Sequence, residues 1–178
     1  GTHVSGILIS NHSTYQGLIP NASIVSVKAI KGDGNGNNTD VIKAIEWCVS
    51  NKETYNISLI SMSLGEGTFQ GVCDSNPLAN ASNIAAEMGM TVVAASGNNY
   101  DSEYNNEFMG SPACGSKVIS VGSVNEAYHI SEFTSLGDHL DMLAPGEIIT
   151  STVPPQDQCP DMCPSEDCQC DNSGFLGL

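Results

Sequence analysis

The sequence contains no arginine and only five lysines, against 20 acidic residues, so its formal net charge is −15. Proteins hold the phosphates of nucleic acid largely through arginine and lysine, and we therefore expect no nucleic-acid partner. Long apolar runs are also missing, and we expect no membrane span because none approaches the roughly 20 residues that a bilayer requires. The acidic excess attracts cations but identifies no substrate.

Cysteine, in contrast, is plentiful. The chain has seven cysteines, an odd number, so at least one thiol is unpaired or pairs with a segment outside these 178 residues. Five Asn-x-Ser/Thr sequences accompany them, and together these features predict an oxidising, extracellular setting. The cysteines are Cys48, Cys73, Cys114, Cys159, Cys163, Cys168 and Cys170, and the Asn-x-Ser/Thr sequences begin at Asn11, Asn21, Asn37, Asn56 and Asn80.

The last four cysteines leave two interpretations open. Zinc sites prefer Cys-x2–4-Cys pairs, and the Cys-x-Cys spacing of Cys168 and Cys170 is tight for that geometry, so disulfides are favoured over a zinc module. Three further histidines have no potential ligands at metal spacing: His12, His129 and His139. We therefore assign no metal-binding residue from the sequence.

Short apolar runs alternate with amphipathic runs along the first 150 residues. The apolar runs predict buried strands at residues 23–30, 57–64, 90–95, 117–124 and 140–143, and the amphipathic runs predict helices at 2–9, 39–50 and 77–88. Thr39 and Asn76 are expected to cap the starts of two of these helices, and Gly89 to end one of them. Strand–helix alternation of this kind is typical of an α/β fold with a parallel sheet.

Polar and glycine residues follow two of the predicted strands directly. In parallel sheets, functional sites lie outside the carboxyl ends of the strands. Gly65 comes after the strand at 57–64, and Gly97-Asn98 comes after the strand at 90–95. The sequence therefore predicts a site at this edge of the sheet.

An ordered set of short motifs carries a family resemblance. In chain order the motifs are Gly1-Thr2-His3-Val4, Ser63-Leu64-Gly65, Ala95-Ser96-Gly97-Asn98, Gly110-Ser111-Pro112-Ala113 and Ala144-Pro145-Gly146. No single motif is decisive, but their order and spacing resemble the subtilisin-like serine proteases (subtilase family, peptidase S8) over residues 1–152. The resemblance implies a three-layer αβα architecture with a mostly parallel sheet, present here as a partial domain.

The resemblance also implies roles for individual residues. His3 matches the catalytic base, and Asn98 matches the side chain that donates to the oxyanion. Ser63-Leu64-Gly65 matches the edge that pairs with extended substrate, and Ala95-Ser96-Gly97 matches one wall of the primary substrate pocket. Glu66 departs from the pattern, because the family often has a small residue there; a solvated glutamate and a preference for basic substrates are both consistent with it.

Two members of the catalytic triad have no counterpart. The family order is aspartate, histidine, serine, so the aspartate is expected before Gly1, and the serine in a Gly-Thr-Ser-Met-Ala segment that does not occur here. The neighbours of Ser173 match nothing in the family. We therefore expect these 178 residues to be inactive in isolation and to come from an active, longer protease.

We accordingly predict two regions, a partial catalytic domain at 1–152 and a Cys-rich irregular segment at 153–178. The predicted function is a secreted serine endopeptidase that hydrolyses polypeptides through a seryl acyl-enzyme. The alternative is a non-catalytic subtilase-like domain that binds peptides or proteins. The family implies no required cofactor; calcium remains an option, since acidic residues 33–40 offer oxygen ligands, although the loop at 10–17 is shorter than the family's usual calcium loop.

Overall fold

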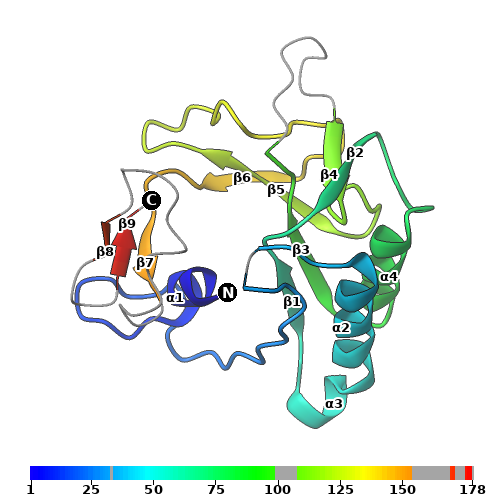
Figure 1. Cartoon of the computed structure of the whole chain (residues 1–178), viewed down its shortest axis with the longest axis horizontal. Helices are drawn as coiled ribbons and strands as arrows, with labels where there is room; N and C mark the ends of the chain where they lie inside the picture. Colours follow the sequence, from blue (N-terminus) through cyan, green and yellow to red (C-terminus); the bar gives the residue numbers. More distant parts are fainter. Residues whose placement is uncertain (33, 99–107, 154–168, 171–174, 178) are drawn as a thin grey trace. The chain divides into compact units, whose positions relative to one another are not determined.

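The computed structural model describes all residues except 33, 99–107, 154–168, 171–174 and 178. Within it the chain forms two compact units (Figure 1). Unit 1 combines Gly1–Ser26 with Gly146–Leu178, and unit 2 is Val27–Pro145. No helix among the described residues has the length and apolar character to span a membrane.

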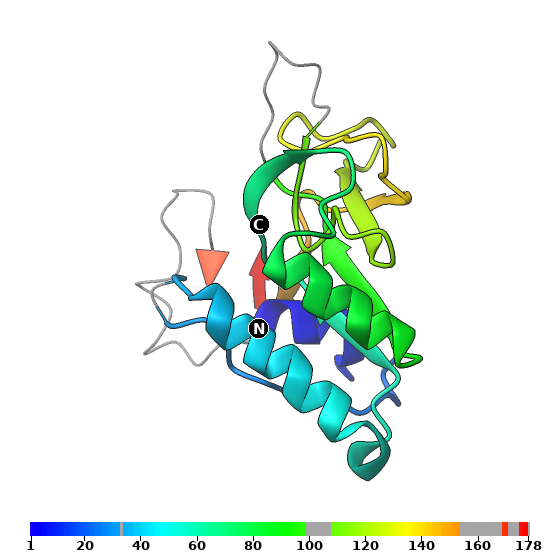
Figure 2. The same ribbon diagram turned by 90° about the vertical axis from the view of Figure 1, so that its right-hand side faces the viewer.

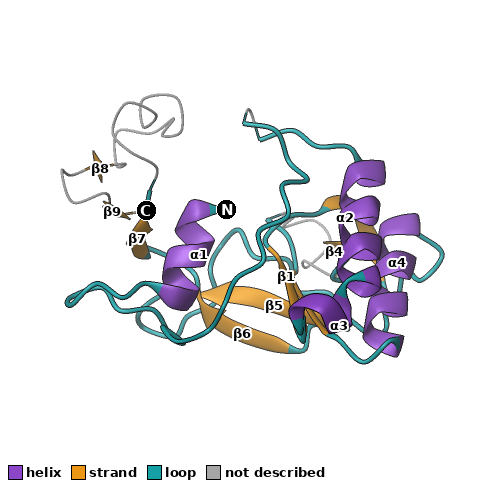
Figure 3. Ribbon diagram, turned by 90° about the horizontal axis from the view of Figure 1, so that it is seen from below, coloured by secondary structure: helices purple, strands orange, loops and turns teal. Residues whose placement is uncertain are grey.

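A four-stranded parallel sheet forms the centre of unit 2. Its strands, in spatial order, are β1 (Leu59–Met62), β3 (Thr91–Ala95), β5 (Ile119–Val124) and β6 (Met142–Pro145). All three pairings are parallel, and Figure 3 shows β5 and β6 side by side. The parallel sheet confirms the predicted α/β class.

Two helices of unit 2 pack together on one face of this sheet (Figure 2). They are α2 (Asn38–Ser50), which is followed by the short α3 (Lys52–Tyr55), and α4 (Pro77–Glu87). Buried apolar side chains from α2, α4, β1 and β3 form one core, in which each contributes residues at its inward positions. The core includes Val41, Ile45, Ile60, Met62, Leu78, Ala85, Val92 and Ala94.

The helix ends test three predictions. The Asn76 side chain accepts hydrogen bonds from the N–H groups of Leu78 and Ala79, so the predicted cap of α4 is confirmed. Gly89 has φ +79°, the left-handed conformation that glycine adopts where a helix ends. The predicted Thr39 cap is wrong, because α2 begins one residue earlier and the backbone carbonyl of Asn37 accepts from Asp40 N–H instead.

The predicted strand at 23–30 is also wrong. Of these residues only Ile30 forms a bridge, with Gly36, and the side chains of Ile24 and Val25 are 38% and 41% exposed. A strand needs a neighbouring strand for its backbone hydrogen bonds, whereas an apolar run predicts only that its side chains can be buried. In the described part of the chain, β1 is an edge strand that pairs with β3 and not with this segment.

The other strand boundaries shift by one or more residues, and one strand pair was not predicted. The strand expected at 140–143 lies at Met142–Pro145, so Ala144 and Pro145 belong to β6. β2 (Glu66–Gln70) and β4 (Phe108–Ser111) form an antiparallel pair with an irregularity between Glu66 and Phe69. Such a bulge disturbs the period-2 pattern by which a strand is recognised.

Unit 1 contains one helix and one small sheet. The helix α1 (Thr2–Ile9) confirms the helix predicted at 2–9, and it packs against β7 (Thr150–Thr152). β7 pairs with β9 (Phe175–Gly177), which in turn pairs with β8 (Gln169–Cys170). The expectation that residues 153–178 are irregular is therefore wrong for β8 and β9, because backbone pairing can form where the sequence shows no periodicity.

A disulfide links Cys73 to Cys114 in unit 2. Both cysteines are buried, and Cys73 N–H donates to the Cys114 carbonyl at 2.9 Å. The bridge joins the chain that enters α4 to the chain that leaves β4. Cys48 is a free thiol on α2, and the side chains of the last four cysteines lie outside the described residues.

We predict that removing this disulfide is costly. The bridge closes a loop with a sequence separation of 41 residues, and loop-closure entropy gives it a stabilisation of about 4 kcal/mol. Replacing Cys73 and Cys114 together by alanine is expected to lower the free energy of unfolding by about that amount in urea titrations. Cys48→Ala is the control, expected to cost less than half as much, and equal losses in both variants would contradict the prediction.

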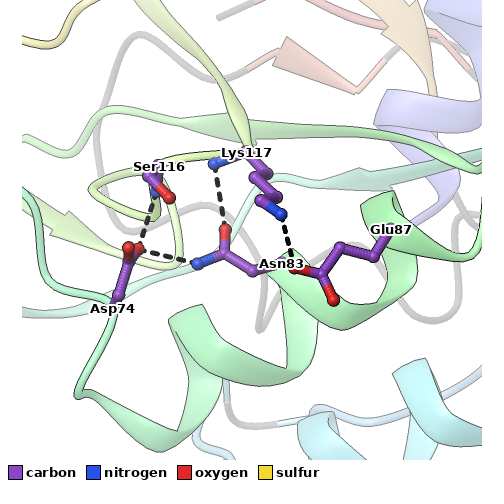
Figure 4. A network of polar contacts seen from close by, with 5 residues as sticks. All are labelled: Asp74, Asn83, Glu87, Ser116 and Lys117. Carbon is purple, nitrogen blue, oxygen red and sulfur yellow. Dashed lines mark hydrogen bonds and ion pairs between the residues drawn. The ribbon is translucent and has the colours of Figure 1, made fainter.

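A polar network joins α4 to the start of β5 (Figure 4). Asp74 Oδ1 accepts from Asn83 Nδ2 at 2.7 Å and from the Ser116 N–H at 2.8 Å. Asn83 Oδ1 accepts from the Lys117 N–H at 3.0 Å, and the Lys117 ammonium pairs with Glu87. Hydrogen bonds from Ser116, and then from Asn83, hold the pKa of the Asp74 carboxyl below its usual range.

We predict an acid-sensitive contribution from Asp74. A carboxyl whose pKa is lowered by folding adds stability that is complete above its unfolded pKa of about 3.9 and disappears as the pH falls through the lower folded value. Asp74→Asn is therefore expected to be less stable than the parent at neutral pH, with the two unfolding curves converging in acid. A stability difference that is constant from neutral pH into acid would contradict this assignment.

Candidate functional site

The site in unit 2 begins where β1 and β3 end. Met62 of β1 and Ala94 of β3 are register partners in a parallel pair, so the two chains leave the sheet at the same edge (Figure 1). Ser63-Leu64-Gly65 follows β1, and Ser96-Gly97-Asn98 follows the last residue of β3, Ala95. The structure thus brings together all of the predicted site residues except His3.

The segment after β1 is exposed at two of its three residues. Ser63 and Gly65 are exposed, whereas Leu64 is partly buried and packs against the core. A Cβ atom on Gly65 would lie 3.0 Å from the Ser111 carbonyl oxygen, so a larger residue would crowd β4. A segment that is anchored by Leu64 and has small residues on either side leaves room for an extended peptide to pair with its backbone.

The segment after β3 is held by backbone hydrogen bonds on both sides. Ser96 N–H donates to the Val121 carbonyl at 2.9 Å, and the Gly97 carbonyl accepts from Ser135 N–H at 3.0 Å. Gly97 has φ +119°, which side chains rarely tolerate. Asn98 follows and is exposed, and its carboxamide carries N–H groups that can donate to an anion.

β4 is a part of this site that the sequence reasoning missed. Gly110 N–H donates to the Ser96 carbonyl at 2.8 Å, and a Cβ on Gly110 would lie 3.7 Å from the carbonyl oxygens of both Glu66 and Ser96. β4 therefore lies against both of the segments described above. The available signal was Gly110 in the Gly110-Ser111-Pro112-Ala113 motif, to which the sequence analysis gives no role in the site.

His3 lies in unit 1, on the first turn of α1. Its side chain is partly buried, and Nε2 lies 3.1 Å from the Ile149 carbonyl oxygen, to which it can only donate. The His3 carbonyl accepts from Ser151 Oγ at 2.6 Å, which attaches this turn to β7. Since His3 and Asn98 belong to different units, their convergence on one cleft stays a prediction.

The described residues include no cluster suited to bind a metal ion. No group of three or more His, Cys, Asp or Glu side chains suited to a metal ion lies within the described ranges. Asp33, in the acidic segment 33–40, and most of the Cys-rich segment are outside them. The alternatives of structural calcium and of zinc at the last four cysteines therefore stay predictions.

Ser96 carries an unpaired buried hydroxyl. Ser96 is 1% exposed, and among the described residues its Oγ is the buried side-chain polar atom without a hydrogen-bond partner. On the neighbouring strand, Ser120 is as deeply buried, but its Oγ accepts from Asp141 N–H at 2.9 Å and lies 2.8 Å from the His139 carbonyl. The two serines are equally buried and differ in whether the hydroxyl has a hydrogen-bond partner, so they can be compared directly.

We predict opposite effects when these two hydroxyls are deleted. Ser96→Ala removes an unsatisfied polar group and is expected to raise the free energy of unfolding by about 1 kcal/mol. Ser120→Ala leaves Asp141 N–H and the His139 carbonyl with one partner fewer and is expected to lower it by about 1–3 kcal/mol. Denaturant unfolding of both variants is the measurement, and a destabilising Ser96→Ala would show that Ser96 Oγ has a partner after all.

A search among protein families matches residues 1–164 to the Subtilase family. Among related sequences, the minor extracellular protease Epr of Bacillus subtilis is 36% identical over 154 residues, which cover 85% of this chain and 22% of that protein. The major intracellular serine protease of the same organism is 38% identical over 157 residues, covering 86% of this chain and 46% of that protein. The chain thus spans less than half the length of these relatives.

Solved structures agree in fold. A cold-adapted subtilisin-like serine proteinase superposes with a TM-score of 0.68 and 30% identity, over 84% of this chain and 50% of that protein. The prenylagaramide maturation protease PagA superposes with a TM-score of 0.69 and 28% identity, over 85% of this chain and 54% of that protein. The predicted subtilisin-like α/β architecture is confirmed by these similarities.

Proposed function

This chain belongs to the subtilase family, and from that membership we propose that it is part of a serine endopeptidase that cleaves polypeptides through a seryl acyl-enzyme. The observation that carries the proposal is the shared edge of β1 and β3. There the segment Ser63-Leu64-Gly65, in which Ser63 and Gly65 are exposed, adjoins the hydrogen-bonded segment that leads to Asn98. A segment suited to pair with extended peptide, beside a carboxamide donor, supplies two of the parts that acyl transfer to a serine can use.

In the proposed reaction, the substrate extends along Ser63-Leu64-Gly65 and its scissile carbonyl carbon is attacked by a serine oxygen. His3 takes the proton of that serine and later gives it to the leaving amine, while Asn98 donates an N–H to the negative oxygen of the tetrahedral intermediate. Water then attacks the acyl-enzyme, with His3 again taking and returning the proton and Asn98 again donating to the negative oxygen, and the free serine is restored. Because His3 Nε2 now faces the Ile149 carbonyl, we expect the ring to leave that contact before it acts as base.

The nucleophile and the orienting aspartate are proposed to lie outside these 178 residues. No Gly-Thr-Ser-Met-Ala segment follows Ala144-Pro145-Gly146, and this chain matches only 46% of the major intracellular protease. The chemistry itself needs no cofactor, so calcium, if bound, would act on stability.

The second candidate function is a non-catalytic subtilase-like domain. The same edge would bind an extended peptide, but no serine would be attacked or acylated. The exposed Ser63 and Gly65 backbone favours peptide binding in either case, so the two functions differ only in the presence of a nucleophile.

Location is a further part of the proposal. We propose an oxidising, extracellular setting, which the buried Cys73–Cys114 disulfide supports. The similar proteins include one named as extracellular and one named as intracellular. The proposal therefore depends on the cysteines of this chain rather than on its relatives.

We predict that a fluorophosphonate probe, which labels activated serines, does not react with the 178-residue chain but does react with a longer protein that contains it. In the longer protein, Asn98→Ala is expected to lower kcat by about 10²–10³ with little change in KM, a magnitude that belongs to a subtilisin. Asn80→Ala, an exposed change on α4, is the control and is expected to leave kcat unchanged.

Two results would count against this assignment. Labelling of the 178-residue chain would show that its nucleophile lies within it. A folded longer protein that binds peptides but neither hydrolyses them nor reacts with the probe would favour the non-catalytic domain.

A further inference from the structure

Glu66 occupies a position next to the proposed peptide edge that the catalytic steps do not use. It follows Gly65 directly, begins β2 and pairs across to Ser111 of β4. The residue is partly buried, whereas most acidic residues of unit 2 are exposed, and its carboxylate has a hydrogen-bond partner. Glu66 is therefore the acidic residue that directly adjoins the proposed peptide edge in the chain.

The carboxylate is positioned by a rigid neighbour. Asn76 Nδ2 donates to Glu66 Oε1 at 3.4 Å. The Asn76 carboxamide is itself fixed, because its Oδ1 accepts from Leu78 N–H at 2.9 Å and from Ser111 Oγ at 2.7 Å. Glu66 is therefore held by an amide that is itself hydrogen-bonded to both α4 and β4. This contact limits the conformational freedom of the Glu66 side chain, so a bound partner has less of it to remove.

No cation offsets this charge within the described ranges. The ion pair found there joins Lys117 to Glu87, and the chain has no arginine and only five lysines. A partly buried carboxylate with one amide contact keeps unused acceptor capacity. A positively charged side chain is the group that would use it best.

We propose that Glu66 selects a basic side chain in the polypeptide that binds along Ser63-Leu64-Gly65. This inference rests on the proposed function, because it assumes that an extended peptide pairs with that edge. In this proposal, a lysine or arginine of the peptide lies near Glu66, with its aliphatic stem along the edge and its charge against the carboxylate. The competing explanation is that Glu66 serves only the positive end of α4 through Asn76.

The experiment measures binding of fluorescent peptides to the intact 178-residue chain by anisotropy. Matched peptides differ at a single position that carries lysine, norleucine or glutamate, and that position is moved along an otherwise neutral sequence. Norleucine keeps the apolar stem and lacks the charge. We expect lysine to bind about three- to fivefold more tightly than norleucine at one position, with a preference that declines from about 0.02 to about 0.5 M salt.

Two variants separate the pairing from general attraction by an acidic protein. Glu66→Gln retains an oxygen for Asn76 and is expected to abolish the lysine preference while the norleucine peptide binds as before. Glu53→Gln removes the same charge from an exposed site on α3, at the amino end of β1, and is expected to leave the preference intact.

Three results would overturn the inference. The first is a lysine preference that is equal at all positions, or equally reduced in both variants. The second is a Glu66→Gln variant that only lowers the thermal stability, which would leave Glu66 as a partner of α4. The third, failure of every peptide to bind, would contradict the proposed function as well, so the baseline given by the norleucine peptide distinguishes the two failures.

Discussion

The parallel pairing of β1 with β3 is the constraint on which the candidate site depends. Because Met62 and Ala94 are register partners, the two chains that follow them must leave the sheet at one edge. A shift of the register by one residue would turn the inward side chains of β3, such as Val92 and Ala94, out of the core. Burial of the core therefore fixes the place where the proposed peptide edge and the Asn98 carboxamide come together.

Behind this edge, the Asn76 side chain connects three elements. It caps α4, accepts from Ser111 of β4 and donates to Glu66 of β2. The Cys73–Cys114 disulfide links the same two connections a few residues away. The antiparallel β2–β4 pair, which has few core residues of its own, is thereby attached to the helix layer, and Gly110 is held against Ser96.

The relation between sequence and structure differs from one element to the next. Helices α2 and α4 could be predicted, since their apolar stripes and, for α4, the Asn76 cap and Gly89 stop are local features. The strand predicted at 23–30 failed because pairing depends on a distant partner that no local pattern specifies. β2 and β4 were missed for a second reason, because a bulged antiparallel pair shows little of the period-2 pattern by which strands are recognised.

The sequence by itself determined the chemical groups and their order: the imidazole of His3, the carboxamide of Asn98, the glycine at 65 and a family whose motifs follow one another at these spacings. Covalent chemistry and local backbone preference suffice for these, because both are properties of a residue and its neighbours. Tertiary structure alone decided that Gly110 adjoins Ser96, that the Ser96 hydroxyl has no partner among the described residues and that Asn76 holds Glu66 beside the proposed peptide edge. Each of these depends on segments that are far apart along the chain, and they meet only when the core and the strand register are formed.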